Sequence, residues 1–191
     1  RSVMKFSMKK VTVLLADGFE EIEALTVVDL LRRAKVYVDT VSITDDYTVR
    51  GAHGIPVQTE DLITEIDFKE SDMIVLPGGM PGTTNLKEDE NVRKAVQEAY
   101  DDGRYVAAIC AAPTILADMG LLKGKRATCY PDMESEIEDA YLTGAPVATD
   151  ENIITSQGVG TAIDFALFSF MHPLLSYQYI NPARNSTSPF L

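Results

Sequence analysis

One cysteine in this sequence occupies a position suited to a nucleophile. The stretch Tyr105–Pro113 reads Tyr-Val-Ala-Ala-Ile-Cys-Ala-Ala-Pro, an apolar, strand-like run that ends at Cys110 and meets a proline typical of a helix start. A side chain at such a sharp strand-to-helix turn projects from the carboxyl edge of a sheet. The helix amino terminus behind it is expected to lower the thiol pKa, and the N–H of Ala111 to stabilise a thiolate. Most single cysteines are simply buried, but the small residues Ala111 and Ala112 leave this one accessible.

A glycine pair ends another buried strand. The apolar run Met73–Leu76 is followed by Pro77–Gly82, which reads Pro-Gly-Gly-Met-Pro-Gly. By itself the pair predicts only a tight turn. If this strand lies beside the one that carries Cys110, the backbone N–H of Gly79 would face an oxyanion next to the sulfur, with Gly78 lining the site. The N–H of Ala111 would be the second donor of an oxyanion hole.

Acidic residues open the first predicted helix, directly after the first strand: Glu20, Glu21 and Glu23. For Glu20 and Glu21 we expect solvated carboxylates that complement the helix amino terminus. Glu23 lies beside the apolar stripe of the helix and is expected to face inward, toward Cys110. A carboxyl buried beside a thiolate has a raised pKa, so Glu23 would act as a proton donor or shuttle near neutral pH.

Strand-like and helix-like segments alternate along the chain, which predicts an α/β fold with a mostly parallel central sheet and helices on both faces. Strands are predicted at 11–16, 36–43, 73–76, 105–109, 127–129, 147–148 and 153–155, and helices at 22–33, 91–102, 113–119, 133–141 and 161–170. Residues 45–60 are predicted to form a hairpin excursion. Ligands of such sheets bind at the carboxyl ends of the strands, where the three features above would meet.

Composition indicates one globular domain. The 191 residues are 46% apolar and 24% charged, which is enough for a single core. We expect an extension over residues 1–9, one domain over 10–170 and a loosely ordered tail over 171–191, where proline, serine and asparagine cluster.

Charge and cysteine content narrow the function classes. A net charge of −12 disfavours nucleic acid and anionic membranes as partners. Cys110 and Cys129 are too few for a disulfide scaffold.

The sequence also shows no sign of a membrane or secretion segment. No apolar run reaches the roughly 20 residues of a membrane span, and the basic start precedes too short an apolar run for a signal peptide. We therefore expect a cytoplasmic protein. Because His53 and His172 are scattered relative to the cysteines, no metal site is expected.

The chain resembles the ThiJ/PfpI superfamily, in the subgroup of the parkinsonism-associated deglycase, from about Lys10 to Phe170. The resemblance rests on four stretches: Ala-Asp-Gly-Phe-Glu-Glu-Ile-Glu at 16–23, Leu-Pro-Gly-Gly at 76–79, Ala-Ile-Cys-Ala-Ala-Pro at 108–113 and Thr-Ser-Gln-Gly-Val-Gly-Thr at 155–161. It implies a flavodoxin-like three-layer sandwich with a nucleophile elbow, commonly a homodimer without a cofactor. It also implies a nucleophilic Cys110, a protonated Glu23 and backbone donors at Gly79 and Ala111.

The sequence departs from the superfamily at the partner histidine. Members with a cysteine–histidine dyad place histidine directly after the cysteine or about twenty residues on, just before a proline; this chain has Ala111 and Tyr130 there. A peptidase-like mechanism is therefore not expected, the general base must be Glu23 or water, and Tyr130 would line the site. A glutamine amidotransferase is also disfavoured, because Pro173 and Leu174 follow His172 where a His-x-Glu pair is needed. For His53, in a loop near the dimer interface of relatives, and for His172 we expect surface or structural roles.

Two functions remain open. The first is an enzyme acting on reactive carbonyls, of the glyoxalase III or protein deglycase type, that protects against carbonyl stress. In it Cys110 adds to the aldehyde of methylglyoxal, glyoxal or an early protein glycation adduct, Glu23 shuttles the proton, and water releases lactate or glycolate. The second is a redox sensor or chaperone without catalysis, in which Cys110 is oxidised to the sulfinate.

Overall fold

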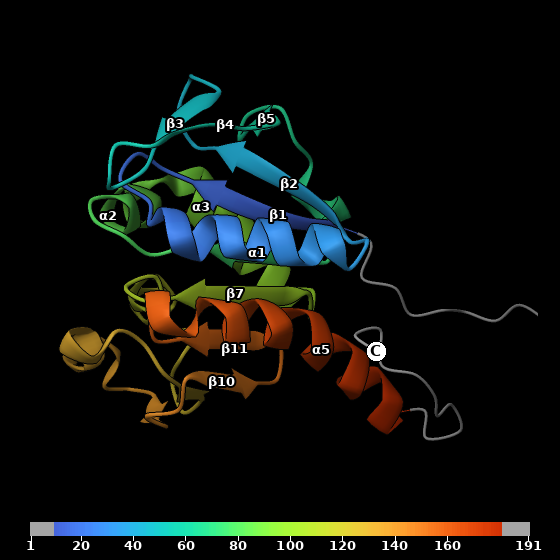
Figure 1. Cartoon of the computed structure of the whole chain (residues 1–191). Coiled ribbons are helices and arrows are strands. Elements are labelled where there is room, and N and C mark those ends of the chain that lie inside the picture. The colour runs from blue at the N-terminus through green and yellow to red at the C-terminus, as the bar shows by residue number, and fades with distance from the viewer. Residues whose placement is uncertain (1–9, 181–191) are drawn as a thin grey trace, which may run out of the picture.

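A seven-stranded sheet runs through the centre of the molecule (Figure 1). The computed structural model describes residues 10–180, and the side chains of residues 10–173. Across the sheet the strands follow the order β10 (Val147–Asp150), β11 (Ile153–Ser156), β7 (Tyr105–Ile109), β6 (Met73–Leu76), β1 (Lys10–Leu15), β2 (Tyr37–Ser42) and β5 (Asp61–Leu62). Every neighbouring pair is parallel except β10 and β11.

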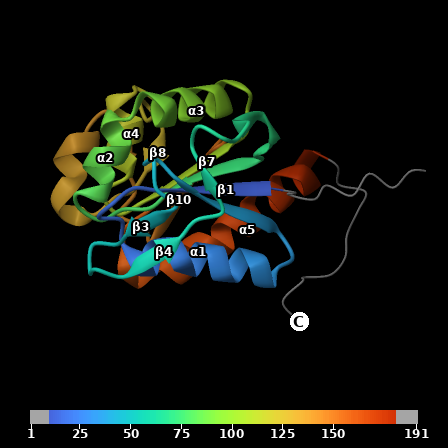
Figure 2. The ribbon, with the colours of Figure 1, turned by 90° about the horizontal axis from the view of Figure 1, so that it is seen from above.

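Helices cover both faces of the sheet (Figure 2). One face carries α1 (Glu21–Arg33) and α5 (Ala162–Ile180), and the other carries α2 (Gly82–Glu88), α3 (Glu90–Asp101) and α4 (Pro113–Asp118). Each face has its own apolar core, one built around Phe19 and Phe165 and the other around Leu86 and Ile115. This arrangement confirms the predicted flavodoxin-like three-layer sandwich with a mostly parallel sheet.

The middle strands are apolar along their whole length because they are buried on both faces. All four residues of β6 are buried, as are the last five of β1 and the last four of β7. Such runs lack a polar face that could sit in water, so the layers on either side are required. The predicted positions of these strands are confirmed to within one residue.

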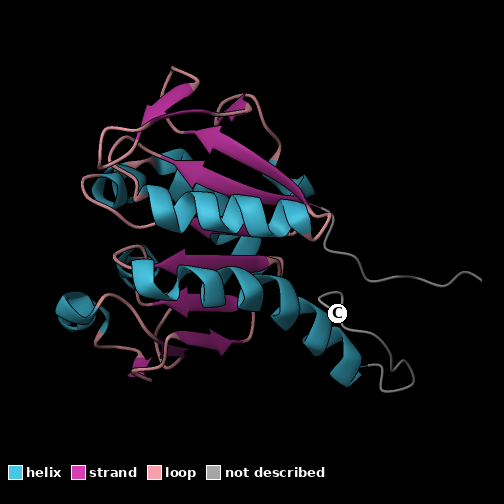
Figure 3. Cartoon of the chain, in the orientation of Figure 1, coloured by secondary structure: helices cyan, strands magenta, loops and turns pink. Residues whose placement is uncertain are grey.

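Shorter strands and helices lie around the central sheet (Figure 3). The predicted excursion is an antiparallel hairpin of β3 (Thr48–Arg50) and β4 (Pro56–Gln58). A second small sheet pairs β8 (Arg126–Ala127) with β9 (Tyr141–Leu142). The part of the chain that the structure describes also has three 3-10 helices: η1 (Phe68–Glu70), η2 (Pro131–Ile137) and η3 (Val159–Thr161).

Some of the expected elements differ in the structure. The helix predicted at 133–141 is the 3-10 helix η2. Helix α2 was not predicted, because it starts at Gly82 after Pro81, without a side chain that caps it. Helix α5 continues to Ile180, so a loosely ordered tail is wrong for residues 171–180; Pro173 lies within the helix, among apolar residues that favour it. Residues 1–9 and 181–191 lie outside the described residues. None of the helices between residues 10 and 180 is long and apolar enough to cross a membrane.

Candidate active site

The loops after β1, β6 and β7 meet at one edge of the sheet. Strand β6 pairs in parallel with β1 on one side and with β7 on the other, as the position of the glycine pair required. The carboxyl ends of these strands therefore bring together the first turn of α1, the Gly78-Gly79 turn and Cys110. This is the edge at which parallel sheets bind ligands.

Cys110 lies at a strained turn between β7 and α4. Its φ of +64° falls in the left-handed region, which is unfavourable for a residue with a side chain. Two hydrogen bonds hold the turn: the Cys110 N–H donates to the Ser156 carbonyl at 3.0 Å, and the Tyr130 N–H donates to the Cys110 carbonyl at 2.8 Å. The turn has the geometry of a nucleophile elbow. The partly buried thiol opens onto a cavity of about 470 Å³.

Glu23 faces inward, as its place beside the apolar stripe suggested. Its side chain is 0% exposed, and Oε2 accepts a hydrogen bond from the Gly78 N–H at 2.9 Å. Oε1 is buried and makes no hydrogen bond of ordinary geometry within the described residues. Burial raises the pKa of Glu23 to about 7, although the Cys110 thiol and the Gly78 N–H act in the opposite direction. A carboxyl with this pKa changes its protonation state near neutral pH.

The thiol of Cys110 does not have the lowered pKa that the sequence suggested. Burial, the charge of Glu23 and the hydrogen-bonding influence of its carboxyl raise the pKa of Cys110 to about 12, against the N–H groups of Ala111 and Gly79. Helix α4 has only six residues, so its amino terminus offsets little of this. The resting pair near neutral pH is therefore a thiol beside a carboxyl that can accept its proton.

Glycine is required between the two side chains. A Cβ at Gly78 would lie 2.6 Å from the Cys110 Cβ and 2.7 Å from Glu23 Oε2, too close for any real contact. Gly79 has φ +92°, a conformation that glycine adopts without strain. The N–H groups of Gly79 and Ala111 both lower the pKa of Cys110, and Gly78 and Gly79 lie beside Cys110 at the cavity.

The outer wall of the cavity comes from two segments: Tyr130-Pro131 and residues 157–161. Tyr130 lines the cavity, as expected, and is 44% exposed. Residues 157–161 belong to one of the four stretches that carry the family resemblance, but no role in the site was predicted for them. It reaches the cavity because β11 pairs with β7, which places the loop after β11 beside Cys110. A Gly-Val-Gly sequence one residue beyond a strand was the available signal.

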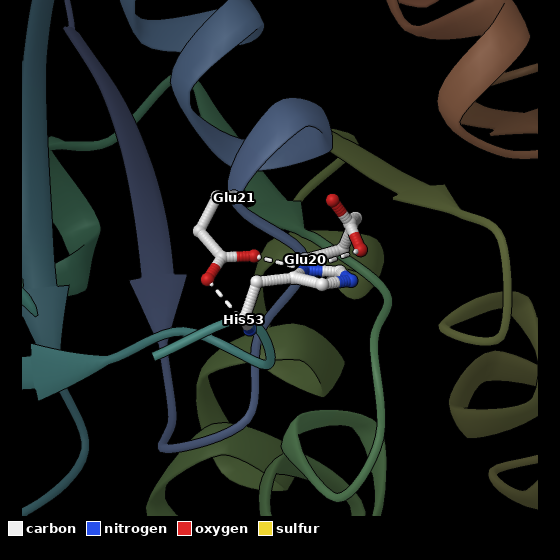
Figure 4. Close-up of side chains that lie close together, drawn as sticks. All are labelled: Glu20, Glu21 and His53. Carbon is white, nitrogen blue, oxygen red and sulfur yellow. Dashed lines mark hydrogen bonds and ion pairs between the residues drawn. The ribbon is translucent and has the colours of Figure 1, made fainter. Parts of the chain in front are cut away.

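The first two glutamates of the helix entry differ from each other (Figure 4). Glu20 caps α1 as expected, accepting from the Ile22 N–H at 3.3 Å, but its side chain is only 13% exposed and lies 3.5 Å from His53 Nδ1, so it is not a solvated carboxylate. Glu21 is only 5% exposed, so the expectation of a solvated carboxylate is wrong. It accepts hydrogen bonds from the backbone N–H and from Nδ1 of His53, both at 2.8 Å. Burial alone would raise the pKa of Glu21, but these hydrogen bonds lower it, and in turn Glu21 raises the pKa of His53.

Glu20, Glu21 and His53 also form the one group of possible metal ligands among the residues that were described, with ligand atoms within 4.8 Å of one another. Both oxygens of Glu21 are already engaged by His53. We therefore interpret the cluster as a clasp that ties the β3–β4 loop to α1. His172 lies elsewhere, edge-on to the ring of Tyr105 with their centroids 5.9 Å apart.

Comparisons with known proteins agree on one family. A profile of the DJ-1/PfpI family matches residues 9–170. The chain is 39% identical over 168 residues to Protein DJ-1 homolog B of Arabidopsis thaliana, covering 87% of this chain but only 38% of that longer protein. It is 33% identical over 171 residues to the glutathione-independent glyoxalase DJ-1 of Schizosaccharomyces pombe, covering 84% and 88% of the two chains. The solved structure of oxidized Toxoplasma gondii DJ-1 superposes with a TM-score of 0.80 at 32% identity, covering 91% and 96%.

Proposed function

The chain belongs to the DJ-1/PfpI family, and from that premise we propose that it is a cysteine-dependent, cofactor-free enzyme that acts on reactive carbonyls. The specific reaction is that of glyoxalase III, the conversion of methylglyoxal and water to lactate. The relative named as a glutathione-independent glyoxalase supports this choice. The same chemistry would apply to early glycation adducts on proteins.

The observation that carries the proposal is the Glu23–Cys110 pair. A fully buried carboxyl whose pKa is about 7, with one oxygen lacking a hydrogen bond of ordinary geometry, lies beside an accessible thiol and two backbone N–H donors. The pair needs no histidine: Glu23 can take the thiol proton as the sulfur attacks. Its raised pKa also lets it return that proton, which a carboxyl with an ordinary pKa would do poorly near neutral pH.

The reaction then proceeds in three steps. The Cys110 sulfur bonds to the aldehyde carbon while Glu23 accepts the thiol proton and passes it to the carbonyl oxygen, which becomes the hydroxyl of a hemithioacetal beside the N–H groups of Gly79 and Ala111. Glu23 next takes the proton from the former aldehyde carbon and gives it to the ketone oxygen, which forms an enediol. It then takes the proton of the hydroxyl on the former aldehyde carbon and gives it to the neighbouring carbon, which leaves a lactoyl thioester. Water cleaves this thioester, releasing lactate and restoring the thiol.

The test is a methylglyoxal assay that follows lactate formation. Wild type, Cys110→Ser and Glu23→Gln are compared, with Cys129→Ser as the matched control because Cys129 is fully buried. We expect the first two variants to lose at least about 100-fold in kcat/KM and the control to stay near wild type. Equal consumption of methylglyoxal by wild type and Cys110→Ser would refute the proposal.

A second candidate function is redox sensing through Cys110. A family member has been solved in an oxidized form, and here Cys110 is accessible while Cys129 is 0% exposed. The two N–H donors would stabilise a sulfinate. Intact-mass measurement after mild peroxide tests this: a gain of two oxygens that maps to Cys110 supports sensing, and oxidation spread over both cysteines, or none, removes it.

We also propose that the chain forms a homodimer. Large apolar side chains are exposed on the first turns of α1 and α5, which start at the same edge of the molecule (Figure 1): Ile22 is 52% exposed and Ile163 is 62% exposed. Patches of this kind mark protein interfaces, and a second copy is the occupant that we expect. Light scattering of wild type and Ile22→Asp measures the mass directly. A cytoplasmic, reducing location fits the two free thiols.

A further inference from the structure

The cavity at Cys110 is much larger than methylglyoxal requires. Its volume is about 470 Å³, whereas one water molecule takes up about 30 Å³ of liquid and methylglyoxal has only a few heavy atoms. If the proposed function holds, most of this volume is free when the smallest substrates are bound. The residues around the free volume then decide which larger aldehydes fit.

One point in the cavity locates the reacting group. A Cβ at Gly158, which the chain lacks, would lie 3.9 Å from Glu23 Oε1 and 4.0 Å from Cys110 Sγ. The same point is 3.7 Å from Cδ2 of the Tyr130 ring. An atom held there is in van der Waals range of the sulfur, the carboxyl and the aromatic ring together. A group attached to the carbonyl carbon therefore touches Tyr130 without leaving the reactive centre.

The wall beyond this point is apolar and well supported. Tyr130 and Val159 both line the cavity, and each is 44% exposed as a whole residue. The Tyr130 backbone is fixed to the elbow by its hydrogen bond to the Cys110 carbonyl. Val159 lies in a turn that the Thr161 hydroxyl holds, through the Gly158 N–H at 3.1 Å and the Ser156 hydroxyl at 2.7 Å. Apolar side chains that are rigid and exposed inside a cavity favour an apolar ligand group.

The opposite side of the cavity gives a substituent no room. Gly78 packs between Cys110 and Glu23 so closely that even a methyl group cannot be placed there. The carboxyl of Glu20 lies on the rim and disfavours a negatively charged substituent. An aldehyde whose oxygen faces the N–H groups of Gly79 and Ala111 must therefore direct the rest of the molecule outward, toward Tyr130 and Val159.

We infer that Tyr130 and Val159 form a specificity wall that selects 2-oxoaldehydes with a large, uncharged apolar or aromatic substituent, such as phenylglyoxal, over glyoxal. This inference rests on the proposed function and names the substrate class of the same site. The ring of an aryl substituent would stack against Tyr130, and its edge would contact Val159. A difference of one methylene in an apolar pocket changes selectivity about 10- to 200-fold. An aryl group should therefore change the selectivity by an amount that a kinetic assay can measure.

The experiment measures kcat/KM for glyoxal, methylglyoxal and phenylglyoxal with wild type, Tyr130→Ala, Val159→Ala and Tyr130→Phe. Tyr141→Ala is the matched control, since Tyr141 is 68% exposed on β9 and does not line the cavity. We expect the ratio of phenylglyoxal to glyoxal to fall about tenfold or more in Tyr130→Ala, chiefly through KM, and less in Val159→Ala. Tyr130→Phe keeps the ring and should keep the ratio, and Tyr141→Ala should match wild type.

The outcomes separate the two proposals. Turnover of glyoxal with a ratio that none of the wall variants changes would overturn the specificity wall and leave the proposed function standing. Absence of turnover with every aldehyde would overturn the proposed function and the wall with it. A ratio that falls in Tyr130→Ala and recovers in Tyr130→Phe supports both.

Discussion

The Cys110 and Glu23 side chains lie on either side of Gly78, so close that a Cβ at Gly78 would be 2.6 Å from the Cys110 Cβ and 2.7 Å from Glu23 Oε2. The Gly78 N–H donates to Glu23 at 2.9 Å. The backbone N–H of Gly78 therefore holds the Glu23 carboxyl in place, and the absence of a side chain at Gly78 leaves room for the carboxyl beside the thiol. The pairing of β6 with both β1 and β7 is what places this glycine between the two groups.

Gly78→Ala should damage both stability and activity. The added methyl group must displace the Cys110 Cβ, the Glu23 carboxyl or the backbone, and overpacking of this kind costs about 1–3 kcal/mol. A displacement of about 1 Å at reacting groups can reduce the rate about 100-fold. Urea unfolding and the lactate assay measure the two effects. Gly103→Ala is the control, because it adds strain at φ +71° where no atom lies within 4 Å; it should lower stability without a comparable loss of activity.

Gly158→Ala should separate activity from stability. Its φ of 163° is extended backbone that any residue adopts, and the new methyl would sit at ordinary contact distance from Tyr130, Glu23 and Cys110. The fold should therefore keep its midpoint of unfolding within about 0.5 kcal/mol. The methyl occupies the point that the substrate needs, so kcat/KM for methylglyoxal should fall at least about tenfold. Unchanged kinetics in a folded variant would mean that the substrate binds elsewhere.

Local pattern was sufficient for the parts of the site that depend on single segments. The apolar run of β7 followed by small residues and Pro113 predicted the turn at Cys110, and the stripe of α1 predicted that Glu23 faces inward. The usual winding of parallel sheets led us to expect that β6 lies beside β7, and this pairing brings the glycine pair beside the cysteine.

Properties of the site that depend on segments far apart in the sequence could not be predicted from local pattern. The part of the wall from residues 157–161 needs the pairing of β11 with β7, and burial of Glu21 needs the β3–β4 loop that covers it. The thiol pKa was predicted in the wrong direction because the helix start and the small neighbours are visible in a sequence, whereas the burial of the thiol, the largest cause of the rise, is not. Helix α5 was predicted to end at Phe170 because proline and serine follow it and are typical of loops, whereas the structure keeps Pro173 inside the helix.

Activity should rise with pH across neutrality. Glu23 accepts the thiol proton only as a carboxylate, and burial raises its pKa to about 7. We expect kcat/KM for methylglyoxal to increase with pH and to level off above an inflection near pH 7. Glu23→Gln should lose this inflection and about 10²- to 10⁴-fold of the rate. A profile that instead declines above pH 7 would show that the protonated carboxyl and a preformed thiolate are the active pair.

Stability should change with pH in the opposite sense. The pKa of Glu23 rises from 4.5 to about 7 on folding, so between these values the native state binds more protons than the unfolded state. Its contribution is complete below pH 4.5 and is lost as pH rises through 7. At about 1.4 kcal/mol for each pKa unit, the loss is about 3 kcal/mol. Urea unfolding of wild type and Glu23→Gln from pH 4.5 to 8 measures the difference, since the variant lacks this dependence; parallel curves for the two proteins would contradict the buried, shifted carboxyl.

The clasp between α1 and the β3–β4 loop should depend on Glu21 more than on its histidine partner. Glu21 is 5% exposed and accepts from the His53 backbone N–H, whereas the His53 side chain is 67% exposed. Glu21→Ala leaves that N–H without its acceptor and should destabilise the protein by about 1–3 kcal/mol. His53→Ala keeps the backbone hydrogen bond and removes only an exposed ion pair, whose contribution is small.

The contribution of the His53 side chain should also depend on pH. Because the pKa of His53 is raised in the folded protein, this contribution is present below pH 6.5 and disappears as pH rises through the higher folded value. Urea unfolding at pH 6 and pH 9 checks both points: a His53→Ala effect as large as that of Glu21→Ala at pH 9 would mean that the ring, and not the buried carboxylate, holds the loop.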